Sequence, residues 1–441
     1  MLKHHLRPTL SYPLGIAMGS IISPRLTFIT LVLAAAGGCH YEVDFGAGKS
    51  FDVENVQDAH GQWPRWRGER VDGVSPETKW NAKWPDEGPK TLWRINVGKG
   101  YSAVAVAAGR AYTLGHKDDT ETVFCLDGGG RTTWNHSYRA QPVDNLHPGG
   151  PGATPTVDGK RVYTLGREGH LFCFDATGGD VVWSKHLQKD FDLKLPEWGF
   201  TSSPLVVDDS LVLDAGPVIA LDKTTGKLLW KTDPFKAGYG SPVLFQHGGR
   251  RLIAVLNNEC LLVVNAEDGQ QIARHPFKSS YETTSVTPIV HEDTIFISAG
   301  YGKGCELLRL ADGKLTRVHE NKKMRNQFST SVLWQGHLYG FDGNSSSSRT
   351  CSLVCMEHAT GKMKWAERGN GCASLMIAGG KLIILSDQGE LVTAEAGAEG
   401  YKQLARAKLF EDTCWTMPVL AGGRIYCRSS TGELACVDVS R

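Results

Sequence analysis

Nearly all of eight short segments of the chain carry aromatic, Arg, His or amide side chains beside Gly, Ser or Thr, as in KGYSA (99–103) and EDTCWTM (411–417). Aromatic and Arg side chains anchor proteins and small ligands in concave sites, because each buries a large area. The chemistry that these segments indicate is therefore binding. The candidate binding residues are Tyr101, His147, Trp198, Phe200, Tyr239, Tyr281, Arg325, Asn326, Phe328, Asn370 and Trp415.

The acidic residues do not indicate catalysis. Many of them recur at equivalent turn positions, where a carboxylate accepts hydrogen bonds from nearby backbone N–H groups. The sequence also has no CxxC pair, no HExxH motif and no cluster of His and Cys. We therefore expect no catalytic residue and no metal site. The recurring acids are Asp127, Asp175, Asp222, Glu357 and Asp438.

The elements that must position the binding residues are copies of one repeat. The phrase ALDKTTGKLLW (220–230) recurs as CFDATGGDVVW (173–183), CMEHATGKMKW (355–365) and CLDGGGRTTW (125–134). The spacing of the strand before each phrase is about 45 residues, the length of a four-stranded propeller blade. Eight copies fit the chain. The marked strands contain Tyr112, Tyr163, Leu211, Leu252, Ile295, Leu338, Leu382 and Ile425.

Each copy predicts four antiparallel strands. The Gly of the TG or DG turn can adopt φ > 0, so the chain reverses there into a fourth strand that ends at a Trp. We expect Trp134, Trp183, Trp230 and Trp365 to dock between blades, and we place Arg274 at the Trp position of the fourth copy. The sequence thus predicts an all-β, eight-bladed propeller over residues 88–441.

The two ends of this region are expected to pair. The eighth copy stops after its third strand, at LACVDVSR, whereas GPKTLWRINVG (88–98) is an isolated apolar strand before the first copy. Pairing them closes the ring and removes open strand edges, which otherwise favour aggregation. In such a ring, each link from an outer strand to the next inner strand crosses one face. The eight candidate binding segments are these links, so they surround one mouth of the channel.

The residues before the propeller divide into three parts. Residues 1–39 are predicted to be a signal peptide, with translation starting at Met18, because a basic region precedes the apolar run 26–36 and small residues. The small residues before Cys39 resemble a lipobox, which implies lipid attachment there; an ordinary cleavage site is the alternative. Residues 40–61 are predicted to be a flexible tether. Residues 62–87, with WPRWRG, are predicted to clasp the propeller's side, with Arg65 and Arg67 solvated or stacked.

Charge and cysteine content narrow the remaining choices. The chain has 48 basic and 47 acidic residues, so no long-range field favours nucleic acid, and we expect a monomer with one folded domain. Cys125, Cys173, Cys355 and Cys436 occupy one repeat position and are expected to pack as small apolar side chains. The nearest candidate disulfide joins Cys351 to Cys355.

The repeated phrase resembles a known family. AxDxxTGxxxW is the docking signature of the pyrroloquinoline quinone (PQQ) propellers, and ALDKTTGKLLW matches every position of it. One branch of that family is the quinoprotein alcohol dehydrogenases, which hold the quinone over calcium in the central funnel. Another is a set of cofactor-free exported propellers similar to BamB, the lipoprotein of the outer-membrane β-barrel assembly machinery. The phrase WPRWRGERVDGVS (63–75) also resembles the opening of bacterial PQQ-like repeat proteins.

Departures from the dehydrogenase pattern favour the second branch. The chain lacks the adjacent Cys pair of those enzymes and is shorter than they are. The resemblance therefore implies a non-catalytic lipoprotein in the periplasm, anchored to the outer membrane, that binds an envelope protein or peptide and needs no cofactor. Two alternatives remain: a PQQ- and calcium-dependent dehydrogenase, or a propeller that binds a carbohydrate or another polymer.

Overall fold

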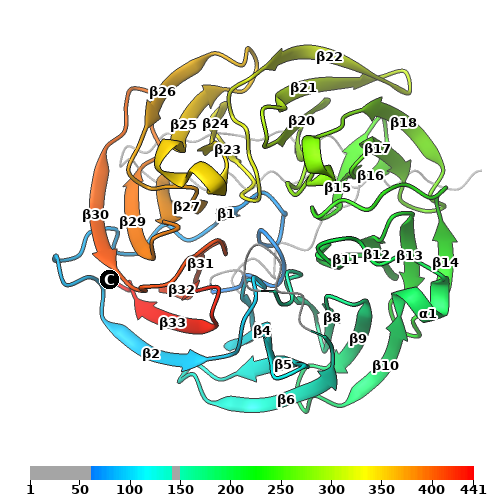
Figure 1. The fold of residues 1–441 in the computed structure, drawn as a ribbon, viewed down its shortest axis with the longest axis horizontal. Helices are drawn as coiled ribbons and strands as arrows, with labels where there is room; N and C mark the ends of the chain where they lie inside the picture. Colours follow the sequence, from blue (N-terminus) through cyan, green and yellow to red (C-terminus); the bar gives the residue numbers. More distant parts are fainter. Residues whose placement is uncertain (1–60, 142–148) are drawn as a thin grey trace, which may run out of the picture. The chain divides into compact units, whose positions relative to one another are not determined.

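Eight sheets surround a central axis in the computed structural model, which describes residues 61–141 and 149–441 (Figure 1). Seven sheets have four strands, and the seventh blade has a fifth strand contributed by the N-terminal segment. The eight-bladed β-propeller predicted from the repeat is thus confirmed. The predicted leader, the tether up to residue 60 and His147 lie outside the described residues.

The first four blades follow the chain from the inner strand to the outer strand. Blade 1 has β3 (Ala105–Ala107), β4 (Arg110–Lys117), β5 (Thr120–Leu126) and β6 (Thr132–Arg139); blade 2 has β7 (Thr156–Asp158), β8 (Arg161–Leu165), β9 (His170–Asp175) and β10 (Val181–His186); blade 3 has β11 (Leu205–Val207), β12 (Ser210–Asp214), β13 (Val218–Asp222) and β14 (Leu228–Lys231); blade 4 has β15 (Val243–His247), β16 (Arg250–Leu256), β17 (Cys260–Asn265) and β18 (Gln271–Pro276).

The other four blades repeat this order, apart from the last. Blade 5 has β19 (Ile289–His291), β20 (Thr294–Ala299), β21 (Gly304–Ala311) and β22 (Lys314–Asn321); blade 6 has β23 (Val332–Trp334), β24 (His337–Asp342), β25 (Ser352–Glu357) and β26 (Met363–Glu367); blade 7 has β27 (Ser374–Ala378), β28 (Lys381–Leu385), β29 (Glu390–Glu395), β30 (Gln403–Lys408) and the added β1 (Val74–Ser75); blade 8 has β31 (Val419–Ala421), β32 (Arg424–Arg428), β33 (Glu433–Asp438) and β2 (Thr91–Asn96).

Helical turns are short and few among the described residues: α1 (Leu187–Phe191), η2 (Ser280–Glu282) and η3 (Ser345–Thr350). Within the described ranges, no helix is long and apolar enough to cross a membrane. The second and third strands of a blade are buried almost continuously, as in β9 and β29, because neighbouring blades cover both of their faces. The core therefore lies in layers between adjacent blades.

The ring closes by pairing the two ends of the propeller. β2 pairs antiparallel with β33, and Trp93 stands opposite Cys436. The Trp93 indole donates a hydrogen bond to the Gly128 carbonyl of blade 1, at 3.1 Å. The predicted closure by an N-terminal strand is confirmed.

Where the repeated Trp is present, it joins its blade to the next one. Trp134 and Trp183 lie within their outer strands rather than at the ends, and their indole nitrogens donate to the carbonyl oxygens of Ala176 and Lys223 in the following blade. Trp134, Trp183 and Trp230 are at most 9% exposed, and Trp365 is half-buried. These contacts repeat around the ring and fix the spacing of the blades.

The Trp position of blade 4 was predicted wrongly. Ala273, not Arg274, pairs with Val263 at the strand irregularity where the other blades carry Trp. Ala273 also follows Gly269 by four residues, the same distance that separates Gly226 from Trp230. In blade 5 the position is held by His319, whose ring nitrogen Nε2 contacts the His358 carbonyl oxygen of blade 6 at 2.9 Å.

The N-terminal segment does not clasp the propeller's side. Trp63 forms a bridge with Val106 of β3, β1 runs parallel to β27, and Glu77 accepts hydrogen bonds from the backbone of Gly422 and Gly423 in blade 8. A segment that contacts the inner parts of blades 1, 7 and 8 must lie in the channel, as the blue trace at the centre of Figure 1 shows. We call residues 62–80 the plug.

Arg67 holds the plug in place and is neither solvated nor stacked. It is only 1% exposed, and its guanidinium donates to the carbonyl oxygens of Asp72 and Ser331, both at 2.9 Å. Burial lowers the pKa of Arg67 to about 10, partly offset by the charge of Asp72. The four surrounding carbonyl groups satisfy the buried cation, as a buried charge requires.

Candidate functional site

A cavity of about 560 Å³ lies in the channel. Its lining includes links that precede blades on every side of the ring, among them Tyr101 before blade 1, Tyr239 before blade 4 and Trp415 before blade 8. The plug residue Trp66 also lines it, and the Trp66 indole donates to Thr287 Oγ1 at 2.9 Å. The plug contacts turns at the far ends of the inner strands, so it limits the cavity on the side away from the links.

Five of the predicted residues line this cavity: Tyr101, Trp198, Tyr239, Phe328 and Trp415. The Tyr101 and Trp415 rings stack with centroids 5.6 Å apart, and Phe328 lies 5.0 Å from Trp415. The Trp198 backbone N–H donates to the Tyr239 hydroxyl at 3.4 Å, and burial raises the pKa of Tyr239 to about 12. Aromatic side chains from five links therefore form the wall of the cavity.

The other described candidates do not line the cavity. Phe200, Asn326 and Asn370 are at most 2% exposed; Asn326 donates to the Phe341 carbonyl, and Asn370 accepts from Arg406. These three side chains are buried within the fold: Phe200 packs in the core between blades, and Asn326 and Asn370 each hydrogen-bond to neighbouring residues. Tyr281, in contrast, is 74% exposed.

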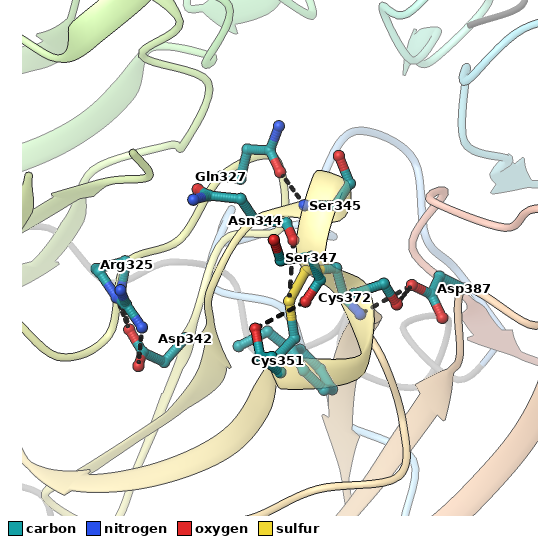
Figure 2. The surroundings of a disulfide bond; sticks show 12 residues. Arg325, Gln327, Asp342, Asn344, Ser345, Ser347, Cys351, Cys372 and Asp387 are labelled. Carbon is teal, nitrogen blue, oxygen red and sulfur yellow. Dashed lines mark hydrogen bonds and ion pairs between the residues drawn. A yellow bond between two sulfur atoms is a disulfide. The ribbon is translucent and has the colours of Figure 1, made fainter. Parts of the chain in front are cut away.

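Arg325 is held by a neighbouring carboxylate. Its Nε and Nη2 atoms donate to the two Asp342 oxygens at 2.7 and 2.9 Å, and the hydrogen bonds with Asp342 raise the pKa of Arg325 (Figure 2). A bidentate pair of this kind fixes both partners. The sequence motifs do not indicate this pair, because Asp342 lies at the end of β24, outside the links.

The turns between the second and third strands supply lining residues that sequence reasoning did not identify. Arg167 follows β8, Tyr301 follows β20, and Ser345 follows β24. In an antiparallel four-stranded blade these turns emerge on the same face as the links, so their position in the repeat could have indicated them. Trp66 lies in the WPRWRG segment, and the sequence around it does not indicate that its side chain enters the channel.

A disulfide fixes part of the cavity rim. Cys351 is bonded to Cys372, not to Cys355, which is a buried free thiol opposite Trp365. The bond joins the end of η3 to the link before blade 7, and Ser345 and Ser346 of η3 line the cavity (Figure 2). The predicted pairing is wrong because residues four positions apart in an extended segment are about 13 Å apart, too far for a disulfide, whereas the true partner is adjacent only in the fold.

Polar side chains complete this rim. Gln327 accepts from the Ser345 backbone N–H at 2.5 Å (Figure 2). Gln327 also donates to the Tyr301 hydroxyl at 2.8 Å, and Asn344 accepts from the Tyr301 backbone N–H at 2.8 Å. Blades 5 and 6 are thereby linked at the mouth of the cavity. The rim is preorganised by a covalent bond and by hydrogen bonds.

The recurring turn carboxylates have local roles. Asp127, Asp175 and Asp222 accept hydrogen bonds from backbone N–H groups two or three residues ahead, at 2.8 to 3.1 Å. The pKa of Asp175 is lowered chiefly by the hydrogen bond from Gly178. In the parts of the chain that the structure describes, no group of three or more His, Cys, Asp or Glu could hold a metal ion.

The residues around the cavity do not fit a quinone held over calcium. Calcium takes oxygen ligands that include carboxylates, whereas the described lining contains no Asp or Glu. The one disulfide among the described residues joins cysteines 21 positions apart, unlike the adjacent pair of the dehydrogenases. We therefore derive no chemistry that uses this cofactor.

The fold and the cavity define an eight-bladed propeller with a cavity on its axis. A family profile described as "Outer membrane protein assembly factor BamB" matches residues 119–367, more than half of the chain, and the chain belongs to this family. A curated relative, the outer membrane protein assembly factor BamB of Burkholderia pseudomallei (strain K96243), is 26% identical over 147 residues. That match covers 32% of this chain, and the chain spans only about a third of the relative's length, 34%.

Solved structures show the same fold at low identity. BamB from Moraxella catarrhalis superposes with a TM-score of 0.58 at 15% identity, over 80% of this chain and 100% of the other. A europium-containing methanol dehydrogenase superposes with a TM-score of 0.66 at 12% identity, over 87% of this chain and 92% of the enzyme. Because binding proteins and enzymes share this architecture, the fold alone does not assign a function.

Proposed function

We propose that this chain is an exported, non-catalytic scaffold that binds an envelope protein at the face formed by the links, and that it contributes to outer-membrane protein assembly. The proposal is supported by membership of the BamB family and by the name of the Burkholderia relative. We further propose that lipid at Cys39 anchors the protein to a membrane and that it acts as a monomer without a cofactor.

The observation that carries the proposal is the presentation of Tyr281 on that face. Tyr281 is 74% exposed and has φ 64°, and the next residue, Glu282, has φ 48°. Two consecutive non-Gly residues with positive φ are strained, and such strain concentrates at functional sites. The Tyr281 ring lies 5.0 Å from that of Tyr301, which lines the cavity. An exposed aromatic in a fixed position is suited to anchor a protein partner.

The disulfide supports an exported location. Cys351 and Cys372 are bonded, and structural disulfides persist in oxidising compartments such as the periplasm. The eight free cysteines among the described residues are all buried, so they are shielded from forming other bonds there. The thiol of Cys427, for example, has a pKa well above its usual value because of burial.

Site-specific crosslinking tests the proposal. A photoreactive phenylalanine analogue at position 281 of the full chain, in native cells, is expected to capture a component of outer-membrane protein assembly. The matched control is the same analogue at Leu229, which is 51% exposed on the outer strand of blade 3. Capture at both positions alike, or no protein captured at 281, would contradict the proposal.

A variant separates binding from folding. Tyr281→Ser removes an exposed ring, so we expect the melting temperature to change by no more than about 2 °C, as for other surface substitutions. The protein identified by crosslinking at position 281 should copurify with the tagged Tyr281→Ser chain at least tenfold less than with the tagged wild-type chain. Leu229→Ser should have neither effect.

A further inference from the structure

We infer that the axial cavity binds a short oligosaccharide that carries a carboxylate. This goes beyond the proposed protein-binding role and does not use Tyr281. Four features support it: the shape of the cavity, its aromatic wall, its hydroxyl groups and its Arg side chain.

The shape is that of a small-ligand site. A volume of about 560 Å³ lies within the range of roughly 300–1,000 Å³ typical of such sites. Trp66 and the rest of the plug limit the cavity on one side, and the links leave it accessible on the other. A folded partner cannot enter a space of this size, whereas the end of a thin chain of sugar rings can.

The aromatic wall matches the apolar face of a sugar. Tyr101 and Trp415 are stacked at an interplanar angle of 20°, and Phe328 extends the same group of rings. Aromatic faces carry partial negative charge, and the C–H groups on one side of a pyranose ring are their natural partners. Trp198 and Tyr239 form a second aromatic group in the lining.

A row of hydroxyl groups runs across consecutive links, just before the inner strands begin. Ser203 Oγ accepts from the Thr154 backbone at 3.0 Å, Ser241 Oγ accepts from the Ser203 backbone at 3.0 Å, and Thr287 Oγ1 accepts from the Ser241 backbone at 3.3 Å. These hydrogen bonds connect blades 2 to 5 near the axis. Each hydroxyl therefore has its oxygen engaged as an acceptor.

The same hydroxyl groups can donate to a ligand. Ser203, Ser241 and Thr287 all line the cavity, and among the described residues none of the three donates its O–H to a protein acceptor. A hydroxyl has one donor and two acceptor positions. The lining thus offers several closely spaced donors, which suit the many oxygen atoms of a sugar better than an apolar ligand.

Arg167 indicates the charge of the ligand. It is the only charged residue in the described lining, is 5% exposed, and donates from Nε to the Trp198 carbonyl oxygen at 3.3 Å. Its backbone N–H, in turn, donates to the Glu121 carboxyl, which fixes the turn. Arg presents several donors in a planar arrangement that matches a carboxylate. A uronic acid or a lactyl-substituted sugar supplies that group.

Calorimetric titration of the full chain tests the inference. The probes are trigalacturonic acid, the disaccharide of N-acetylglucosamine and N-acetylmuramic acid, and neutral maltotriose. We expect at least one carboxylated probe to bind at least tenfold more tightly than maltotriose. The first two probes distinguish a uronate polymer from the cell-wall glycan as the source. No binding of either one at millimolar concentration, or equal binding of maltotriose, would overturn the inference.

Variants assign the binding to the cavity. Trp415→Ala should lower the affinity for the carboxylated probe at least tenfold, and Trp415→Phe should retain most of the wild-type affinity. Arg167→Gln should remove the preference over maltotriose. Leu229→Ser is the control for both, and an unchanged far-ultraviolet circular dichroism spectrum with a single cooperative melting transition verifies folding. Wild-type affinity in folded Trp415→Ala and Arg167→Gln would place the site elsewhere and overturn the assignment.

The two proposals can fail separately. Tyr281→Ser should keep full affinity for the sugar while it loses the protein partner. Conversely, Trp415→Ala should lose the sugar and keep the crosslink at position 281. Loss of sugar binding in Tyr281→Ser would show that cavity and rim form one site, and it would overturn the separation of the two.

Discussion

The docking Trp residues and the turn glycines of neighbouring blades depend on one another. A Cβ atom added to Gly179 would lie 2.5 Å from the Trp134 ring, and one added to Gly226 would lie 2.8 Å from the Trp183 ring. Both glycines also have positive φ. The Gly and the Trp of one TGxxxW phrase therefore belong to two different inter-blade contacts. The Gly packs against the Trp of the preceding blade, and the Trp packs against the Gly of the following blade.

Removing a docking Trp should destabilise the ring at a defined joint. Trp183→Ala leaves a cavity between blades 2 and 3 and removes the indole hydrogen bond to the Lys223 carbonyl, so we expect a loss of about 3–5 kcal/mol in the free energy of unfolding. Denaturant titration measures it. Val182→Ala, on the same strand but 41% exposed, should cost below about 1 kcal/mol. Equal losses of unfolding free energy in Trp183→Ala and Val182→Ala would show that Trp183 does not stabilise the contact between blades 2 and 3.

A buried histidine between blades 5 and 6 should make stability depend on pH. His358 is 5% exposed, its Nε2 has no hydrogen-bond partner, and its ring lies 5.5 Å from His291. Burial first, and the positive charges of His291 and His319 next, lower the pKa of His358 from 6.5 to about 4. The unfolded chain therefore takes up this proton at a higher pH than the folded chain does.

The sign of the effect follows from this difference. The contribution of neutral His358 to the free energy of unfolding is fully present above about pH 6.5. It is lost as the pH falls toward 4, because the unfolded state binds more protons in that range. His358→Gln should reduce the loss between pH 7.5 and 5 by about 1–2 kcal/mol. His247→Gln, in blade 4, is the control and should leave the loss unchanged. The same pH dependence in both variants would contradict the assignment to His358.

At the scale of elements, the sequence predicts the blades but not the plug. Blade strands recur at a fixed spacing, so their identity is a local property that can be counted. The plug has no repeat, and its contacts join residues such as Trp66 and Thr287 that are 221 positions apart. The disulfide and the Arg325 ion pair also follow no repeat. Cys372 is the partner of Cys351, and Asp342 is the partner of Arg325, and each pair is adjacent only in the folded chain.

The candidate site was predictable to a similar extent. Repeat position placed Tyr101, Tyr239 and Trp415 in the cavity lining, because every link occupies an equivalent place in the ring. Repeat position alone could not distinguish a side chain that faces the cavity from one packed under the rim. Phe200 and Asn326 show this, since both lie in links and both are buried.

Truncations should separate the roles of β2 and the plug. A chain that begins at residue 61 keeps both and should melt like the full chain. A chain that begins at residue 88 keeps β2 but loses Arg67 and the buried Trp63 and Trp80, so it should remain soluble with a lower melting temperature. A chain that begins at residue 99 leaves β33 as an open edge and should aggregate. Light scattering and calorimetry distinguish the three.

The comparison between the two shorter chains is decisive for closure. If the chain from residue 99 were as soluble and as stable as the chain from residue 88, β2 would not be needed to close blade 8. The control is the chain from residue 61, which carries the same tag and differs only in its N-terminal segment.

At the scale of the whole molecule, a repeated scaffold presents a surface that is not repeated. The docking contacts recur from blade to blade, whereas the links and second-to-third-strand turns differ in every blade and meet around one cavity. Stability and function can therefore change independently, since a substitution in a link leaves the inter-blade layers intact. The rim near η3 is an exception, because its disulfide serves both.

Membrane attachment is expected to depend on one residue outside the propeller. Cys39 lies outside the residues that the structure describes. Acyl chains add about 0.8 kcal/mol of membrane affinity for each buried CH₂ group. Cys39→Ser should therefore move the protein from the membrane fraction to the soluble periplasmic fraction, with an unchanged melting temperature. Ser50→Ala in the predicted tether is the control and should stay with the membrane. Retention of Cys39→Ser in washed membranes would instead indicate that the apolar run 26–36, or a tightly bound partner, holds the chain there.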